Sequence, residues 1–303
     1  MPNAAGPAEI SKVGIYHHPE LDAARDFAGE IRDRVAASDR EVWVSSAWDP
    51  VASTRDLPDT NLLIAIGGDG TVLRAARAVV PYPVAILGVD MGRLAFLTEF
   101  EPDDLRAHLD DVLAGKFSID ERTMLDVDFE GFGDAAPGGT VSGLNDVTVG
   151  RTSLGRPVYV NVRLNGDLIG VLRGDGVVVA TATGSTGYSL SAGGPILDPT
   201  SRFLVLTPVA PHLAAGVPLV LPPDSEIELS VGGPSEVAVS VDGQGAHPFD
   251  EQGRVHVRRS EHVARMVRYR EKPFFAQLGR RLAWLDERRL KAVSLPDESR
   301  PRD

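Results

Sequence analysis

The sequence contains no cysteine among its 303 residues, and only four of its 31 basic residues are lysine. Without cysteine there is no disulfide, no thiolate nucleophile and no cysteine-ligated zinc. The longest apolar stretches, such as 62–66 and 84–87, fall far short of the roughly 20 residues that cross a bilayer. Residues 1–9 lack the basic-then-apolar pattern of a signal peptide. We therefore expect a cytoplasmic protein without a membrane partner.

Positive charge is scarce as well, because the formal net charge is −12. Binding along a nucleic-acid backbone needs concentrated lysine and arginine, so nucleic acid is not expected as a partner. A small phosphorylated ligand needs only a local positive site and stays compatible with this charge. The remaining composition, 43% hydrophobic and 24% charged residues, is typical of a globular chain with room for two domains.

Strands and helices are expected to alternate in the first part of the chain. Apolar residues recur at three- and four-residue spacing over 21–35, as on one face of a helix. The expected strands cover 12–16, 41–44, 62–66 and 84–88, and the expected helices cover 21–37, 71–79 and 103–114. This alternation predicts an α/β domain with a largely parallel sheet over residues 1–117.

Residues 118–270 are expected to form a β-rich, sandwich-like domain. Short alternating or β-branched runs lie at 124–129, 140–149, 158–164, 176–181, 226–231 and 237–241. The pairs Asn165-Gly166 and Asp242-Gly243 favour tight hairpin turns, while 185–192 carries the residues of a helix start. Helical spacing returns at 274–290, so we expect residues 271–293 to form a helix against the first domain. The tail 294–303 is expected to be disordered.

The first chemical motif is Gly67-Gly68-Asp69-Gly70-Thr71, which follows a buried strand and begins a helix. Ligands bind at the carboxyl ends of strands in open α/β sheets, and the free N–H groups of a helix start suit phosphate. A carboxylate there can accept the proton of an attacking hydroxyl or hold a magnesium ion that bridges phosphates. In the alternative, structural interpretation the glycines only shape a turn and Asp69 caps the helix.

The second motif spans 174–195, where a strand runs into glycines and small hydroxyl residues. Thr183, Ser185 and Thr186 offer hydroxyl groups for a phosphate or a ribose without any lysine. Tyr188 offers a ring for stacking or a phenol for hydrogen bonding, and Asp175 can bind a ribose hydroxyl or an exocyclic amine. A structural role in turns and caps is the alternative.

The ordered set of motifs resembles the NAD kinase family. The matching segments are 67–71, 88–97, 144–146, 174–195, 207–208, 211–212 and 242–244, and the resemblance extends over about 12–285. The first motif by itself also resembles those of sugar phosphofructokinases and diacylglycerol-type lipid kinases. The second motif has no counterpart in those two groups of kinases, so it makes the resemblance to the NAD kinases specific.

The resemblance implies a kinase that phosphorylates the adenosine ribose 2′-hydroxyl of NAD to give NADP. ATP, or polyphosphate, would be the donor, with Mg²⁺ or another divalent metal held mainly by the donor phosphates. Asp69 would be catalytic, and the donor phosphates would lie on Gly67, Gly68, Gly70 and Thr71. The residues implied for NAD are Asp69, Gly70, Arg74, Asn145, Asp146, Arg156, Arg173, Asp175, Thr186, Gly187, Tyr188, Ser189, Ser191 and Gln244. A homodimer or homotetramer is also implied.

The chain departs from the family pattern at several positions, among them Asp146 for the usual glutamate and Gly187 for the usual alanine. These changes leave the choice between NAD and NADH as acceptor open. Two other functions are weighed against the leading one. The first is a kinase of the same architecture with a different acceptor, and the second is a non-catalytic dinucleotide-binding sensor.

Overall fold

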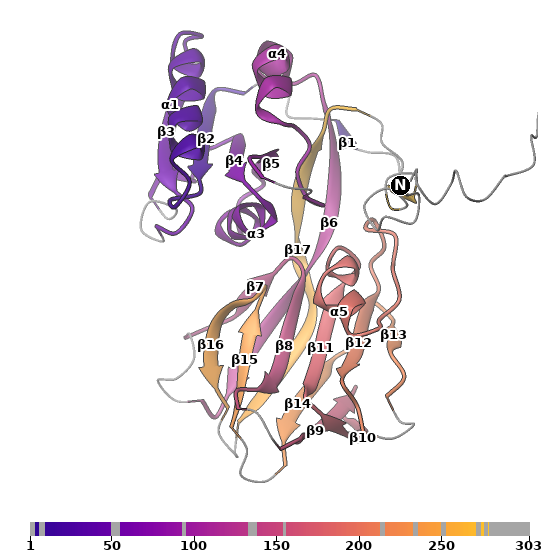
Figure 1. The fold of residues 1–303 in the computed structure, drawn as a ribbon. Coiled ribbons are helices and arrows are strands. Elements are labelled where there is room, and N and C mark those ends of the chain that lie inside the picture. Colours follow the sequence, from indigo (N-terminus) through magenta and orange to yellow (C-terminus); the bar gives the residue numbers. More distant parts are fainter. Residues whose placement is uncertain are drawn as a thin grey trace, which may run out of the picture. The chain divides into compact units, whose positions relative to one another are not determined.

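The computed structural model describes residues 4–5, 10–49, 55–92, 95–132, 138–153, 156–212, 216–232, 236–249, 253–270, 274–275 and 278. The chain divides into two compact units, Met1–Tyr269 and Arg270–Asp303. The fold below is that of the first unit (Figure 1). The helix expected over 271–293 and the tail expected over 294–303 lie outside the described residues, except for 274–275 and 278.

Alternating strands and helices fill the first part of this unit, and strands dominate the second. The helices are α1 (Asp22–Ala36), α3 (Asp69–Ala78), α4 (Pro102–Leu113) and α5 (Tyr188–Ser191). The first strands are β1 (Ala4–Ala5), β2 (Lys12–His17), β3 (Glu41–Ser46), β4 (Leu62–Gly67), β5 (Ala85–Asp90), β6 (Ser118–Glu130), β7 (Val141–Gly143), β8 (Asp146–Arg151) and β9 (Val158–Leu164). The later strands are β10 (Asp167–Gly174), β11 (Gly176–Thr181), β12 (Leu204–Val209), β13 (Leu219–Leu221), β14 (Ile227–Val231), β15 (Val237–Val241), β16 (Gln244–Pro248) and β17 (Arg254–Arg268).

The first part is an α/β layer structure, as expected from its alternation. β3, β2, β4 and β5 pair in parallel in that order. Along β4 the side chains alternate between two cores: Leu62, Ile64 and Ile66 pack with α1 and α4, whereas Leu63 and Ala65 pack with α3. Period-two alternation places neighbouring side chains on opposite faces, so a strand covered by helices on both faces is apolar throughout. The predicted parallel sheet is confirmed.

The second part consists of two facing antiparallel sheets. One contains β10, β9, β14 and β17, and the other has the order β13-β12-β11-β8-β15-β16. Their inner faces share one core, in which valines of β8 and β11 meet valines and leucines of β9, β14 and β17. In β9, β14 and β15 buried positions alternate with partly buried or exposed ones, which matches a sheet with one covered face. The expected β-rich second part is therefore confirmed.

Two long strands connect the parts into one sheet. β6 and β17 pair antiparallel over most of their length, with an irregularity between Arg259 and Val263. The end of β17 then pairs in parallel with β5, at Arg265 with Ala85 and Met266 with Ile86. The parallel sheet of the first part thus continues through β17 into the second part (Figure 1).

Several elements differ from the sequence expectations. The run 140–149 is two strands, β7 and β8, because Leu144 and Asn145 form a turn between them. The helix start expected over 185–192 gives a 3₁₀ turn (Gly184–Thr186) and the single helical turn of α5. None of the expected strands covers β1, β10, β12, β13, β16 or β17. No helix in the described part of the chain is long and apolar enough to cross a bilayer.

Candidate active site

The first motif forms the connection from β4 to α3. All of β4 is buried, and Gly68 precedes the helix in an extended conformation with φ −125° and ψ −166°. A Cβ at Gly67 would lie 2.2 Å from Oγ1 of Thr71, so only glycine lets the helix begin this close to the strand. A Cβ at Gly68 or Gly70 would meet no atom within 4 Å. The peptide surface at these two glycines is open to a ligand.

Asp69 is the first residue of α3, but it does not cap the helix. No side chain caps the start of α3. Instead, the backbone N–H of Phe96 donates to Oδ2 of Asp69 (2.9 Å), and the N–H of Leu97 donates to Oδ1 (2.8 Å). Each carboxylate oxygen can accept more than one hydrogen bond. The carboxylate is therefore oriented by a loop 27 and 28 residues away while keeping the capacity to accept a substrate proton.

A cavity of about 490 Å³ opens beside Asp69. It is lined by residues 67–71, Arg74 and Gln244, all of which are predicted site residues. The other lining residues include His18, Trp48, Asp90, Asp242 and Gly243. The cavity therefore brings together chain segments that lie more than 170 residues apart.

Two arginines on α3 give this region its positive charge. Arg74 lines the cavity beside Asp69, and both Arg74 and Arg77 line an adjoining cavity of about 560 Å³. Arg77 donates to Oε1 of Gln244 (3.0 Å), and the Arg74 guanidinium lies 4.7 Å from the Trp48 ring centroid. Neither arginine forms an ion pair with a carboxylate of the described residues. Arg77 lies in the last turn of α3 and interacts electrostatically with Asp242, so Arg74 supplies the positive charge that suits a polyphosphate beside Asp69.

The Asn145–Asp146 pair lies where β7 connects to β8, and hydrogen bonds to the Asp242 side chain fix this connection. The carboxylate of Asp242 accepts backbone N–H groups of Leu144 (2.9 Å), Asn145 (2.7 Å) and Asp146 (3.1 Å). Oδ1 of Asn145 is buried without a hydrogen-bond partner among the described groups. Because a buried polar atom without a partner is unfavourable, this oxygen is an acceptor suited to a ligand donor such as an amine or hydroxyl.

Asp146 and Asp242 form a buried acidic pair. Burial, and then the neighbouring Asp242, raise the pKa of Asp146 to about 7, against the opposing hydrogen bond from Thr148. Burial also raises the pKa of Asp242, although three backbone amides stabilise its ionised form. For Asp146 only the hydrogen bond from Thr148 opposes the rise in pKa. Shared burial of two acids is typical of sites that bind or transform a ligand.

The segment 183–187 sits directly against the Asn145 turn. A Cβ at Gly184 would lie only 2.0 Å from the backbone oxygen of Asn145, so this position requires glycine. At Gly187 a Cβ would lie 3.7 Å from Nδ2 of Asn145 and 3.9 Å from Oδ2 of Asp146. Two predicted ligand-binding segments that lie about 40 residues apart thus meet, with Gly187 facing both polar side chains.

Most hydroxyls of the second motif serve the protein itself. Ser185 is fully buried, donates to the backbone oxygen of Ala182 (2.7 Å) and accepts the N–H of Leu197 (3.0 Å). Ser189 is also buried and bonds the hydroxyl of Thr207 (2.8 Å). The structural reading of this segment therefore accounts for Ser185 and Ser189.

Tyr188 and Asp175 line a further cavity of about 400 Å³. Tyr188 is 46% exposed, so its ring is available for stacking. The Asp175 carboxylate pairs with Arg151, at 2.8 Å from Nε and 2.9 Å from Nη2. These residues do not line the cavity beside Asp69, so the structure brings the predicted residues together at two places.

The other predicted residues lie at the surface. Arg156 and Ser191 are exposed, and the guanidinium of exposed Arg173 lies 5.8 Å from the ring centroid of Tyr159. Sequence reasoning missed Arg77, Asp242 as a support, and Arg151. Asp242 lay within the noted Asp-Gly-Gln segment, whereas the contact of Arg151 with Asp175 depends on the pairing of β8 with β11.

A carboxylate held at a glycine-rich strand-to-helix turn, with Arg74 lining the same cavity, is typical of a phosphoryl-transfer site. Family models support this class. The ATP-NAD kinase N-terminal domain matches residues 9–117, and the ATP-NAD kinase C-terminal domain matches residues 144–269.

Known proteins with similar sequences are NAD kinases as well. The NAD kinase of Dehalococcoides mccartyi is 38% identical over 264 residues, which cover 87% of this chain and 93% of the relative. That of Wolinella succinogenes is 32% identical over 287 residues, covering 92% and 97%. The chain belongs to the NAD kinase family.

Solved structures show the same fold. Yeast NADH kinase complexed with NADH superposes with a TM-score of 0.82 at 22% identity, covering 96% of this chain and 91% of that chain. An NAD kinase from Archaeoglobus fulgidus in complex with ATP gives a TM-score of 0.71 at 26% identity, covering 90% and 98%.

Proposed function

We propose that the protein transfers the terminal phosphoryl group of ATP to the adenosine ribose 2′-hydroxyl of NAD and releases ADP and NADP. Phosphorylation of NAD to NADP is the activity of the family to which the chain belongs. The observation that carries the assignment to residues is the Asp69 carboxylate, fixed by the amides of Phe96 and Leu97 at a cavity of nucleotide-binding size.

In the proposed step the 2′-oxygen attacks the terminal phosphorus of the donor. The bond from that phosphorus to the bridging oxygen breaks, and ADP leaves with the electron pair. The hydroxyl proton passes to the Asp69 carboxylate. Arg74 and the N–H groups at the start of α3 face the donor phosphates. Positioning and charge neutralisation contribute most of the rate enhancement in such transfers.

A divalent metal is part of the proposal, because it would neutralise the charge of the donor phosphates. The described residues contain no cluster of three or more histidine or acidic side chains suited to hold an ion. Of the acids at the cavity, Asp242 is already bound to three amides, which leaves Asp69 and Asp90. Mg²⁺ is commonly held by one or two carboxylates with phosphates and water, so this donor set fits it.

On the acceptor side we assign Asn145, Asp146, Thr186 and Gly187 to NAD. The partnerless oxygen of Asn145 and the two polar side chains that face Gly187 support this assignment. Gln244 belongs to the cavity beside Asp69. Tyr188 and Asp175 are proposed to contact another part of the dinucleotide, at the cavity they share with Arg151.

Other expectations remain predictions. These are the two-domain division at about residue 117, the homodimer or homotetramer, the cytoplasmic location, the use of polyphosphate as donor, and the NAD contacts of Arg156, Arg173, Ser189 and Ser191. Ser189 has the least support, because its hydroxyl is buried against Thr207. Size-exclusion chromatography with light scattering would test the oligomer.

A coupled assay with an NADP-specific dehydrogenase tests the proposed reaction. Purified protein would receive NAD or NADH, Mg²⁺, and either ATP or polyphosphate. Asp69→Asn should lower kcat by about 10²–10⁴-fold, because the amide cannot accept the proton. Asp26→Asn, on the exposed face of α1, makes the same change of charge away from the site and should leave kcat unchanged.

The other two functions are outcomes of this assay. NAD binding without product, under every donor condition, would support a sensor. Absence of both binding and product, with turnover of another nucleoside or lipid, would support a kinase with a different acceptor. Unchanged turnover in Asp69→Asn would remove the carboxylate from the mechanism while leaving the reaction itself intact.

A further inference from the structure

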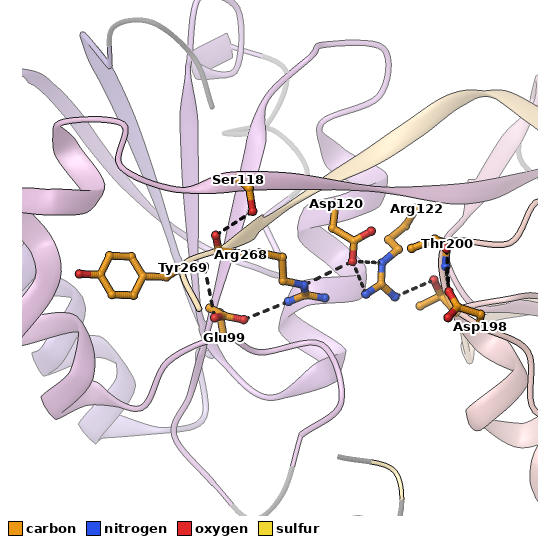
Figure 2. A network of polar contacts seen from close by, with 9 residues as sticks. Glu99, Ser118, Asp120, Arg122, Asp198, Thr200, Arg268 and Tyr269 are labelled. Carbon is orange, nitrogen blue, oxygen red and sulfur yellow. Dashed lines mark hydrogen bonds and ion pairs between the residues drawn. The ribbon is translucent and has the colours of Figure 1, made fainter. Parts of the chain in front are cut away.

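A largely buried chain of ionic contacts links Glu99, in the loop after β5, to Arg268 on β17 and to Asp120 and Arg122 on β6. Arg122 lies on β6 and is only 7% exposed, and its Nε and Nη2 contact Oδ2 of Asp120 at 2.8 and 2.6 Å. The same oxygen is 3.4 Å from Nε of Arg268 on β17, whose Nη1 is 3.3 Å from Oε2 of Glu99. Figure 2 shows these four side chains in one continuous line.

One end of this chain reaches residues 183–186, which are called the acceptor turn below. Nη1 of Arg122 donates to Oγ1 of Thr183 at 3.4 Å, and Thr183 is itself buried. The hydroxyl of Thr186 donates to the backbone oxygen of Thr183 (3.2 Å). Arg122 therefore supports, through Thr183, a side chain that the proposed function assigns to NAD. The sequence offers the Thr183 hydroxyl for a phosphate or a ribose, and in the structure this hydroxyl accepts the bond from Arg122.

The other end reaches the loop that holds the catalytic carboxylate. Glu99 follows Leu97, whose amide donates to Asp69, by two residues. The Glu99 carboxylate accepts the N–H of Tyr269 (3.2 Å) besides the bond from Arg268, and its own N–H donates to the oxygen of Gly88 (2.9 Å). The loop is thus fastened to β5 and β17 close to where it contacts Asp69.

We propose that Arg122 is a positioning residue for phosphoryl transfer, which sets the acceptor turn 183–186 relative to Asp69 through Asp120, Arg268 and Glu99. A buried arginine–carboxylate ion pair is weak evidence of a stabilising role, since well-packed apolar residues often replace such a pair without lowering the free energy of unfolding. It does fix geometry, because the planar guanidinium directs its donors rigidly. This inference rests on the proposed function of Asp69 and Thr186.

The two ends should affect different kinetic constants. Displacement of the acceptor turn weakens NAD in the ground state and the transition state alike, and so raises KM for NAD. Displacement of the loop at Glu99 turns the carboxylate that accepts the proton, and so lowers kcat. A contact that only stabilised the fold would lower the melting temperature without separating these two constants.

The test compares steady-state kinetics, calorimetric NAD binding and melting temperature for variants at both ends. Arg122→Lys keeps the charge beside Asp120 but lacks the second arm that reaches Thr183. Arg122→Lys and Thr183→Val should each raise KM and the dissociation constant for NAD about tenfold, with kcat within about twofold. Thr183→Ser restores the hydroxyl and should behave as the original protein. Glu99→Gln should lower kcat about tenfold with little change of KM.

Thr123→Val is the matched control. Thr123 is the next residue on β6, is also buried, and donates to the backbone oxygen of Ser201 (3.3 Å) outside the ionic chain. It should lower stability while leaving KM for NAD unchanged. The double variant Arg122→Lys/Thr183→Val should raise KM for NAD no further than either single variant does, because both substitutions remove the same hydrogen bond.

Either of two results would overturn the inference: unchanged NAD binding in folded Arg122→Lys and Thr183→Val, or effects of these variants that Thr123→Val reproduces. If Arg122→Lys does not fold, the Thr183→Val and Thr183→Ser pair decides the question alone. The proposed function has a separate readout, because it fails if the unaltered protein makes no NADP, whereas the inference fails only when that protein is active.

Discussion

Replacing Asp146 by asparagine should stabilise the protein and impair NAD binding at the same time. The Asp146 carboxylate is buried beside the Asp242 carboxylate, and burial, then Asp242, raise its pKa to about 7. In the unfolded chain that pKa is 3.8. Between these values the folded protein holds a proton that the unfolded chain has lost. Stability therefore falls as pH rises through this window.

The size of the effect follows from the two pKa values. The stabilisation by Asp146→Asn should be absent below about pH 3.8 and should grow by about 1.4 kcal/mol per pH unit up to about pH 7. Above pH 8 it should level off at about 4 kcal/mol, an upper limit because water and relaxation reduce the penalty of a buried charge. The amide keeps the size of the side chain, so no cavity forms.

Urea unfolding and thermal melts at pH 5 to 9 would measure the stability difference, and the coupled assay would measure KM for NAD. Asp128→Asn is the control of opposite sign. Burial raises the pKa of Asp128, but the Thr140 hydroxyl and Arg258 outweigh it, so that pKa is lowered. Asp128 therefore contributes stability above its unfolded pKa, and Asp128→Asn should destabilise. Equal or lower stability of Asp146→Asn at pH 8, or a pH-independent difference, would refute the reasoning.

Two further predictions concern the acceptor region. Gly184→Ala would place a Cβ 2.0 Å from the backbone oxygen of Asn145, so we expect the free energy of unfolding to fall by about 2–4 kcal/mol and little NADP to form, as measured by thermal melts and the coupled assay. The control is Gly187→Ala, whose Cβ lies 3.2 Å or more from other atoms and which should fold normally. Equal stability and activity of the two variants would refute the crowding argument. Asp175→Ala and Arg151→Met should each raise KM for NAD about tenfold, because Arg151 fixes the Asp175 carboxylate. Unchanged KM and calorimetric affinity in both would exclude this pair from the acceptor site.

The motif-bearing strands and helices could be predicted because their signals are local. The continuous apolar run 62–66 indicates a strand covered on both faces, and β4 is buried throughout. Apolar spacing over 21–35 predicts the helix observed as α1. The long strands β6 and β17 were harder, because each passes from a sheet with two covered faces into one with a single covered face. The buried pattern therefore changes along the strand.

The sequence by itself determined the family, the α/β-then-β order, and the residue types at the Gly67–Thr71 turn, since each depends on near neighbours in the chain. Only the tertiary structure decided what Asp69 and Asn145 contact. The amides that orient Asp69 come from Phe96 and Leu97, and the carboxylate beneath Asn145 comes from Asp242. It also showed that Ser185 and Ser189 are internal. Such contacts join segments brought together by strand pairing and helix packing, and no local spacing of residue types encodes which distant partner a polar group will meet.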